Sequence, residues 1–536
     1  MNNKKRIYTY INFTLRFLTI FIVFQIFGNL TLYIKNQFFM AKSEETWEKV
    51  AISNGVTGNK VIDYIIINDT DSNNLEDVVS KYLDYSKSSY QVLRHMDEIT
   101  EDLQKSIKVV FLCDNTVNAQ EKQILNSLLN KGISIVFLQI PDSTCIKQQD
   151  LFNMLGIKED INKISQKGIR FISDFLLGGR QDYPNIKLDM LSVKLKSTCK
   201  TYVYGLAKPR DNEKNTNEEL PPIIWRNSYY NGQVFVVNGS LINSDYGYGI
   251  IPAMLAQLQE DYIYPAVNGL AMIIQGFPYF ENVNEYELQS RYSTNALGLQ
   301  QDILWPSIIS ISKKHDIAPG FFMAQGMDTV VDSVTKKALA YYIKEIKALG
   351  GDIGAIQDDI VSFEGTQLKR WDTFTNYNES GEKSTIIPIT LDGFTYTDKE
   401  RLAFYSRVTA LGIITQRTDM KSILYPINDD YDWVKVSVSL DTLIGRLRKE
   451  FAGIDSVNIT ELTKRMKGYQ LLEPVIQYKE DSINIHMQRL NGNGYFILRT
   501  NKKIDSIRGG RYKQMEECAY LIEAQQNDII IKMYQD

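Results

Sequence analysis

The chain has 536 residues and a net charge of −4, and 44% of its residues are hydrophobic, which is typical of a globular protein with room for several domains. Only 3 histidines stand beside 32 tyrosines and 23 phenylalanines, which argues against any mechanism that needs a histidine cluster. The 4 cysteines lack Cys-x-x-Cys spacing and so disfavour a zinc site, and the mildly acidic body indicates no nucleic-acid partner and would suit a polycationic polymer better.

Residues 17–34 form an uncharged apolar run of 18 residues, close to the roughly 20 that cross a bilayer core. Several cations precede this run, so residues 1–16 should form a cytoplasmic tail. The apolar run is long, and residues 35–43 contain no clear small-x-small cleavage site, which favours a retained signal anchor over a cleaved signal peptide. We therefore expect a single-pass cell-membrane protein with a cytoplasmic N-terminus and the bulk of its chain outside the cell.

Residues 58–262 alternate apolar runs with helical patterns. The expected elements are strands at 61–67, 107–112 and 133–140 and helices at 75–85 and 120–129. Strand and helix in alternation are typical of a doubly wound parallel sheet, and we expect a flavodoxin-like α/β domain. After residue 200, antiparallel strands are expected around a turn at Asn231-Gly232. No glycine-rich nucleotide motif follows the first strand, which favours a structural or protein-contact role over a ligand site.

Residues 266–460 show a second alternation of strands and helices. Strands are expected at 270–274, 319–323, 386–391 and 411–415, and helices at 303–314, 334–349 and 399–409. Two stretches in this region stand out, His-Asp-Ile-Ala-Pro-Gly-Phe-Phe-Met at 315–323 and Leu-Gly-Gly-Asp-Ile-Gly at 349–354. With the strand that precedes them, they resemble the motifs of the NodB-type polysaccharide deacetylases.

This resemblance implies a distorted (β/α) barrel over residues 266–460. In that family an aspartate of the first strand and two histidines four residues apart hold a divalent metal that activates water. On this sequence the aspartate pair falls near Gln275 and Gly276, and the two histidines fall on Ile356 and Ile360. Isoleucine cannot coordinate a metal, so we expect no metal, no cofactor and a catalytically degenerate deacetylase-like domain.

Carboxylates and aromatic residues near these positions are further candidates. Asp358 and Asp359 lie next to the degenerate motif, and Asp392 ends a strand, where barrel enzymes place functional groups. Two of these three carboxylates would suit an acid and base pair on a glycosidic bond, or all three are solvated loop residues. The aromatic side chains expected to bind substrate by stacking on sugar rings, or alternatively to pack in the core, are Trp371, Tyr279, Phe394 and Tyr396.

Residues 461–536 show short alternating strands, clearest at 483–487, 494–500, 519–524 and 528–533, and predict a C-terminal β-sandwich. The order of anchor, flavodoxin-like domain, deacetylase-like barrel and β-sandwich resembles that of the Pel exopolysaccharide modification proteins. That resemblance implies a place in the synthesis and export of an extracellular polysaccharide.

Three functions follow from these expectations. The first is a membrane-anchored extracytoplasmic protein that binds or guides a polysaccharide through the degenerate barrel. The second is an active polysaccharide deacetylase or a carboxylate-based glycoside hydrolase on the same polymer. The third is an assembly scaffold, whose partner would be a membrane glycosyltransferase or export complex.

Overall fold

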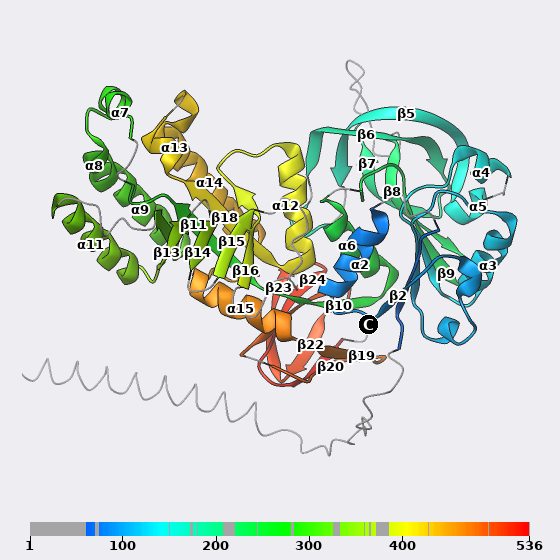
Figure 1. The fold of residues 1–536 in the computed structure, drawn as a ribbon. Helices are drawn as coiled ribbons and strands as arrows, with labels where there is room; N and C mark the ends of the chain where they lie inside the picture. The colour runs from blue at the N-terminus through cyan, green and yellow to red at the C-terminus, as the bar shows by residue number, and fades with distance from the viewer. Residues whose placement is uncertain are drawn as a thin grey trace, which may run out of the picture. The chain divides into compact units, whose positions relative to one another are not determined.

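The computed structural model describes most of residues 61–534 (Figure 1). The gaps in this range are residues 70–73, 149–150, 172–174, 180, 207–219, 244, 280–282, 325–332, 358–359, 364–365, 371–384, 427 and 491. Residues 1–60 also lie outside the described residues, and with them the anchor expected at 17–34. Within the described ranges, no helix is long and apolar enough to cross a membrane.

A nine-stranded sheet begins the described chain, and half of it is parallel. Its parallel strands are β1 (Tyr64–Ile67), β2 (Tyr90–Leu93), β3 (Val109–Leu112), β4 (Ser134–Phe137) and β9 (Gly232–Val237). They pair in the order β2-β1-β3-β4-β9, which is the order of strands in flavodoxin-type sheets. All four residues of β1, β3 and β4 are buried, because helices cover both faces of this half.

Alternate side chains of these strands enter two different cores. Tyr64 and Ile66 pack with α2 (Leu75–Tyr85) and α6 (Gly247–Leu258) on one face. Ile65 and Ile67 pack with α3 (Ala119–Asn130) on the other face. Shorter helical segments complete this part of the chain, namely η1 (Met96–Glu98), η2 (Leu103–Lys105), α4 (Ser143–Gln148) and α5 (Phe152–Leu155).

The other half of the sheet is antiparallel and contains a hairpin that the sequence did not predict. Its strands are β8 (Pro222–Tyr229), β7 (Cys199–Gly205), β5 (Ile157–Phe171) and β6 (Asp182–Leu195). The two strands of the β5–β6 hairpin are polar on their exposed faces, so they lack the continuous apolar run that identified β1 and β3. The turn between β8 and β9 consists of Tyr230 and Asn231, with Gly232 already in the strand, so the turn expected at Asn231-Gly232 was misplaced by one residue.

An eight-stranded sheet forms the second large unit of structure. Its strands are β11 (Gly269–Gln275), β12 (Gly320–Ala324), β13 (Asp352–Gln357), β14 (Ile360–Phe363), β15 (Thr366–Arg370), β16 (Thr385–Ile389), β17 (Leu391–Asp392) and β18 (Ile413–Asp419). They pair in the order β16-β15-β14-β13-β12-β11-β18-β17. Strand β14 is antiparallel to both of its neighbours, and the other pairs in this sheet are parallel.

This sheet closes on itself into a barrel. Its two end strands, β16 and β17, are consecutive in the chain and are separated by Thr390 alone. The Thr390 N–H donates to the carbonyl oxygen of Thr415 in β18 at 3.1 Å, and it also donates to the Thr415 hydroxyl at 2.8 Å. The pairing therefore runs through a complete circle, with β14 as its irregular strand.

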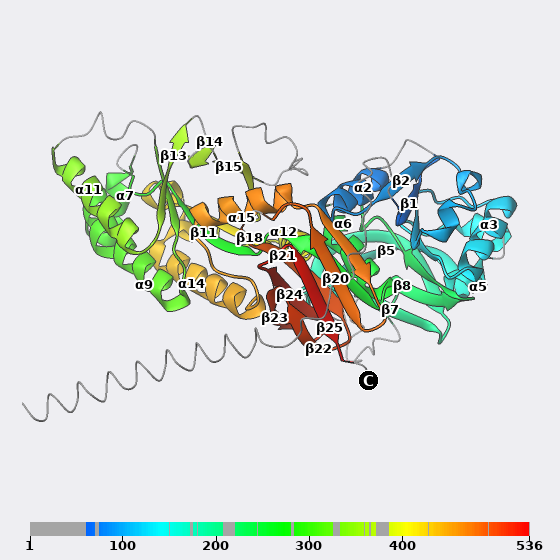
Figure 2. The ribbon, with the colours of Figure 1, turned by 90° about the horizontal axis from the view of Figure 1, so that it is seen from below.

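Helices cover the outside and the amino end of the barrel (Figure 2). The main ones are α9 (Trp305–His315), α11 (Ser333–Ala348), α12 (Asp398–Leu411), α14 (Trp433–Glu450) and α15 (Ile459–Leu471). The shorter ones are α7 (Glu285–Tyr292), α8 (Ala296–Gly298), η4 (Leu299–Leu304), α13 (Lys421–Leu424) and η6 (Asp429–Tyr431). Helix α15 packs so closely on the starts of β11 and β12 that a Cβ on Gly269 would lie 2.5 Å from Leu462.

Two four-stranded sheets form a sandwich near the C-terminus. One contains β10 (Asp261–Ala266), β21 (Gly494–Thr500), β24 (Ala519–Ala524) and β23 (Gly510–Glu516), and the other contains β19 (Pro474–Tyr478), β20 (Ser482–Met487), β25 (Asp528–Met533) and β22 (Ile504–Arg508). Ile263, Phe496 and Ile522 of the first sheet share a core with Ile485 and Ile531 of the second. Strand β10 precedes the barrel in sequence yet pairs with β21, so the sandwich draws one strand from the segment before the barrel.

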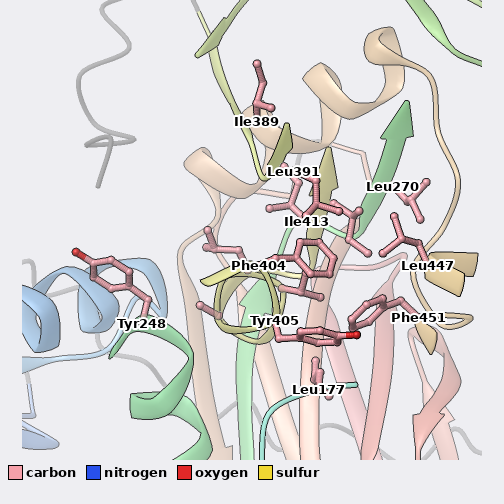
Figure 3. Packing of buried hydrophobic residues seen from close by; sticks show 14 of the residues in the cluster. Leu177, Tyr248, Leu270, Ile389, Leu391, Phe404, Tyr405, Ile413, Leu447 and Phe451 are labelled. Carbon is pink, nitrogen blue, oxygen red and sulfur yellow. The ribbon is translucent and has the colours of Figure 1, made fainter. Parts of the chain in front are cut away.

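Helix α12 lies between the first sheet and the barrel, and Figure 3 shows the packing around it. All residues from Leu402 to Leu411 are buried, so the helix is covered on every side. Its contact with α6 is close, because a Cβ on Gly249 would lie 2.4 Å from the Ser406 carbonyl oxygen. The Gly249 N–H donates to the Ser406 hydroxyl at 2.7 Å. The position of α12 therefore depends on both of the layers that it joins.

Candidate functional site

The carboxyl end of the barrel is the first place to look for function, because barrel enzymes assemble their sites from residues at the carboxyl ends of their strands. Strands β11, β17 and β18 end at Gln275, Asp392 and Asp419. In the sheet register, Gln275 lies opposite Asp419, and Asp392 lies opposite Arg417. Three neighbouring strands thus bring four polar side chains to one end of the barrel.

Arg417 connects two of the positions that the sequence singled out. Its Nε donates to Asp392 Oδ1 at 2.8 Å, and its Nη2 donates to Asp392 Oδ2. Its Nη1 donates to Gln275 Oε1 at 3.2 Å. A bidentate pair of guanidinium and carboxylate is one of the stronger polar contacts in proteins. Arg417 therefore holds the ends of β11 and β17 together, and the sequence analysis did not identify it.

Asp392 was a candidate catalytic carboxylate, and the structure shows how its oxygens are used. Both of them accept hydrogen bonds from Arg417, and the side chain is 31% exposed. A general acid or base needs an oxygen within reach of the substrate proton. In this arrangement Asp392 serves the internal ion pair, and its companions Asp358 and Asp359 lie outside the described residues.

Asp419 is a carboxylate that the sequence analysis missed. Burial raises its pKa, while the nearby backbone N–H of Lys421, Arg417 and the Lys421 side chain act in the opposite direction. The Lys421 N–H donates to Asp419 Oδ1 at 2.9 Å. Gly276 leaves room for this carboxylate, because a Cβ there would lie 3.3 Å from Asp419 Oδ1. The sequence-based strand ended at residue 415, four residues short of this aspartate.

The residues at the implied metal positions do not fit a divalent metal. Gln275 accepts a hydrogen bond from Arg417, and Gly276 has no side chain to offer. Ile356 is half-buried against the main hydrophobic core, and Ile360 begins β14 opposite Gln357. In the described part of the chain, no three His, Cys, Asp or Glu side chains are grouped so that they would hold a metal ion. We therefore derive no reaction step through a metal.

The three histidines of the chain pair with aspartates in other places. His315 Nε2 lies 2.8 Å from Asp441 Oδ1, which joins α9 to α14 on the outside of the barrel. His486 Nδ1 lies 2.6 Å from Asp528 in the sandwich. The third, His95, lies 3.4 Å from Asp69 beside the first sheet. None of them reaches the described carboxyl end of the barrel.

The aromatic candidates occupy different environments. Tyr279 is 7% exposed, and its backbone exchanges two hydrogen bonds of 2.7 Å with the buried side chain of Gln300. Its ring is part of the core and offers little surface to a sugar. Phe394 and Tyr396 are half-buried in the loop between β17 and α12. Trp371 lies outside the described residues.

Tyr396 borders two pockets on the surface of this region. The first pocket has a volume of about 390 Å³, and its other lining residues include Asp392, Asp245, Lys399, Glu400 and Arg407. The second, of about 340 Å³, is lined on its other sides by Phe394, Arg401, Ser439, Thr442 and Arg446. The Tyr396 hydroxyl donates to the Gly393 carbonyl oxygen at 2.6 Å, and burial raises the pKa of this phenol. The ring is thus fixed between the two pockets.

Comparisons with known proteins support this description of the fold. The sequence matches a family model described as an uncharacterised protein conserved in bacteria (DUF2194) over residues 47–354 and 365–521, and the chain belongs to this family. No curated protein matches the sequence.

Among solved structures, Agd3, described as a novel carbohydrate deacetylase, matches with a TM-score of 0.53 and 8% identity, over 89% of this chain and 99% of its own. At this identity the match shows a shared fold. A β-galactosidase from Bacillus circulans sp. alkalophilus has a TM-score of 0.25 and 18% identity, over 34% of this chain and 29% of its own. A ThuA-like protein from Bacteroides uniformis has a TM-score of 0.25 and 9% identity, over 34% of this chain and 86% of its own.

Proposed function

We propose that this protein binds or guides a polysaccharide at the carboxyl end of a deacetylase-like barrel and does not carry out metal-dependent deacetylation. The observation that carries the proposal is the network of Arg417 with Asp392 and Gln275. Gln275 is one of the positions at which the resemblance to the NodB-type deacetylases implies a metal ligand, and its side-chain oxygen accepts a hydrogen bond from the Arg417 guanidinium group. The fold shared with Agd3, a carbohydrate deacetylase, supports a carbohydrate as the ligand.

The two pockets beside Tyr396 are the proposed binding surface. Aromatic rings suit the apolar C–H faces of sugars. Tyr396 lines both pockets and Phe394 lines the second, and both side chains are half-buried. Hydroxyl and charged groups of the surrounding helices provide the polar contacts that orient a bound ligand. The proposal therefore uses the aromatic loop between β17 and α12, and it uses the barrel end as a rigid support for that loop.

Binding and chemistry are separated by one experiment on the full-length protein in detergent. Acetylated and partly deacetylated amino-sugar oligosaccharides are titrated by calorimetry, and acetate release is measured with and without added Zn²⁺ or Mn²⁺. We expect binding without acetate release. Acetate release that depends on the metal would contradict the proposal. Failure of every oligosaccharide tested to bind would contradict it as well.

We also propose that residues 17–34 anchor the chain in the cell membrane and place the body outside the cell, in the synthesis or export of an exopolysaccharide. The support is the uncharged apolar run with cations before it. The order of the domains, which resembles that of the Pel exopolysaccharide modification proteins, supports the same setting. A protease added to intact cells should digest the body and leave the N-terminal tail protected. Full protection of the body would contradict the proposed orientation.

Asp419 favours a second candidate function, a glycoside hydrolase that uses carboxylates. Asp419 is half-buried at the end of β18, and a carboxyl whose pKa is raised by burial is the usual form of a general acid in such enzymes. The same oligosaccharides are therefore tested for release of new reducing ends. If the wild type releases new reducing ends and Asp419→Asn does not, hydrolysis is supported. If the wild type releases no new reducing ends, binding alone is left as the function.

A further inference from the structure

We infer that the pocket between the Phe394–Tyr396 loop and helix α14 is a subsite for a negatively charged sugar residue, such as a uronate. This inference rests on the proposed function and adds the chemical class of the ligand. The walls of the pocket belong to the loop after β17, the start of α12 and the middle of α14. Its volume of about 340 Å³ lies at the lower end of the range for small-molecule sites.

The pocket carries two arginines, and none of the described residues that line it is acidic. One of them, Arg401, is already engaged. Its Nη2 donates to Asp398 Oδ1 at 3.0 Å and to the Asp182 carbonyl oxygen at 2.7 Å, and its guanidinium lies 4.7 Å from the centre of the Tyr183 ring. Asp398 in turn accepts the Asn185 N–H at 2.8 Å. This arginine therefore fixes α12 to β6 and contributes its charge from the pocket wall.

Arg446 is the arginine that is available to a ligand. It is exposed, and it makes no hydrogen bond or ion pair with another residue in the described ranges. The acid one turn further along α14, Glu450, accepts the Tyr405 hydroxyl at 2.6 Å. A guanidinium group binds a carboxylate through two parallel hydrogen bonds. Arg446 thus offers such a site at the edge of a pocket that also contains aromatic rings.

The neighbouring surface of α14 extends this pocket along the helix. Val434, Val438, Thr442 and Arg446 follow one another at intervals of four residues, so each lies next to the previous one along the surface of the helix. All four are exposed, and the two valines are 64% and 63% exposed. An apolar strip that ends in hydroxyl and guanidinium groups suits a sugar chain, whose ring faces are apolar and whose substituents are polar.

The aromatic rings, hydroxyls and arginine of this pocket together favour a charged sugar over other anionic ligands. A free phosphate or a lipid head group would use the arginine alone, whereas a uronate would also use the rings of Phe394 and Tyr396 and the hydroxyls of Ser439 and Thr442. The net charge of −4 for the whole chain suits a cationic polymer, but the local charge of this pocket is positive. The pocket is therefore expected to prefer sugars that carry a carboxylate over amino sugars.

The test compares an oligogalacturonate with a neutral galactose oligomer of equal length, titrated against the full-length protein in detergent at one fixed salt concentration. We expect the wild type to bind the uronate about tenfold more tightly than the neutral oligomer. Arg446→Gln should lose this preference, because it removes the guanidinium group that pairs with the carboxylate of the uronate. Arg448→Gln is the matched control, because it removes a positive charge from the same helix outside the pocket.

The outcomes separate this inference from the proposed function. Equal affinities of the wild type for the two oligomers, or equal losses in the Arg446 and Arg448 variants, would overturn the charged subsite and leave polysaccharide binding intact. Failure of both oligomers to bind would overturn both. Competition by inorganic phosphate as strong as that by the uronate would show a general anion site and overturn the assignment to a sugar.

Discussion

Arg417 and Arg446 both lie near the loop between β17 and α12, and the protein uses them in opposite ways. Arg417 is 19% exposed and gives its donors to Asp392 and Gln275. Arg446 is exposed and donates no hydrogen bond to any of the described residues. The charge of a residue near a barrel end therefore does not by itself identify a ligand site. The state of its hydrogen bonds decides whether it supports the fold or remains available to bind.

The largest effect that tests this comparison is expected at Arg417. Arg417→Ala leaves the Asp392 carboxylate without its counter-charge, and we expect the free energy of unfolding to fall by about 2 kcal/mol. This loss is smaller than that for a fully buried ion pair, because both side chains are partly exposed. Arg446→Ala should change stability by less than about 0.5 kcal/mol. Urea unfolding measures both.

The control for that comparison is the double variant Arg417→Ala/Asp392→Ala. Removing both partners removes the uncompensated charge, so the double variant should be more stable than Arg417→Ala alone. Equal stability of the Arg417 and Arg446 variants would remove the distinction between the two arginines.

A change in the contact that positions α12 should affect both arginine sites together. Gly249→Ala places a Cβ 2.4 Å from the Ser406 carbonyl oxygen, and the resulting shift of α6 against α12 should cost about 2 kcal/mol. We expect a lower midpoint of thermal unfolding and weaker binding of oligosaccharides at the same time. Stability that falls with no change in binding would show that the pockets do not depend on this contact.

The aromatic loop should matter for binding more than for folding. Phe394→Ala removes a ring face from the pocket, and we expect an affinity for oligosaccharides about tenfold lower. Because the ring is half-buried, the stability should fall by about 1 kcal/mol or less. Phe394→Leu keeps the volume and loses the aromatic face, so it separates packing from stacking. Unchanged affinity in both variants would exclude the loop from the binding surface.

The smallest expected effect is a dependence on pH at Asp419. Burial raises the pKa of this carboxyl in the folded state, so between the ordinary pKa and the raised one the folded chain binds more protons than the unfolded chain. The stability contributed by Asp419 is therefore present at low pH and is lost as the pH rises from about 4 through the raised pKa. The difference in stability between Asp419→Asn and the wild type should move in favour of the variant over this window. A difference that stays constant with pH would refute the raised pKa.

Much of the architecture was predictable from the periodicity of apolar residues. The uniformly apolar runs that form β1, β3, β4 and β11 identified buried parallel strands, and the strand order of the first half agrees with a doubly wound sheet. The helix expected at 399–409 matches α12 to within two residues at each end. The hairpin β5–β6 and the pair β14–β15 were missed, because short or half-exposed strands carry too weak a pattern.

The candidate site was predictable only in part. A carboxylate after an apolar run pointed to Asp392, and the spacing of a family motif pointed to Gln275. Nothing in the local sequence around Arg417 distinguished it from the other basic residues. The closeness of Arg446 to Phe394 and Tyr396 was equally hidden, since these residues are about 50 positions apart in the chain.

The pattern of apolar residues was enough to locate most of the longer strands and helices and the faces that they bury. The tertiary structure decided which polar groups meet. Asp392 lies opposite Arg417 because β17 and β18 pair in one register, and Gln275 reaches the same guanidinium because β11 pairs with the other edge of β18. Registers between strands depend on the packing of the whole barrel, so a contact between residues 142 positions apart follows from the closed sheet and not from either segment alone.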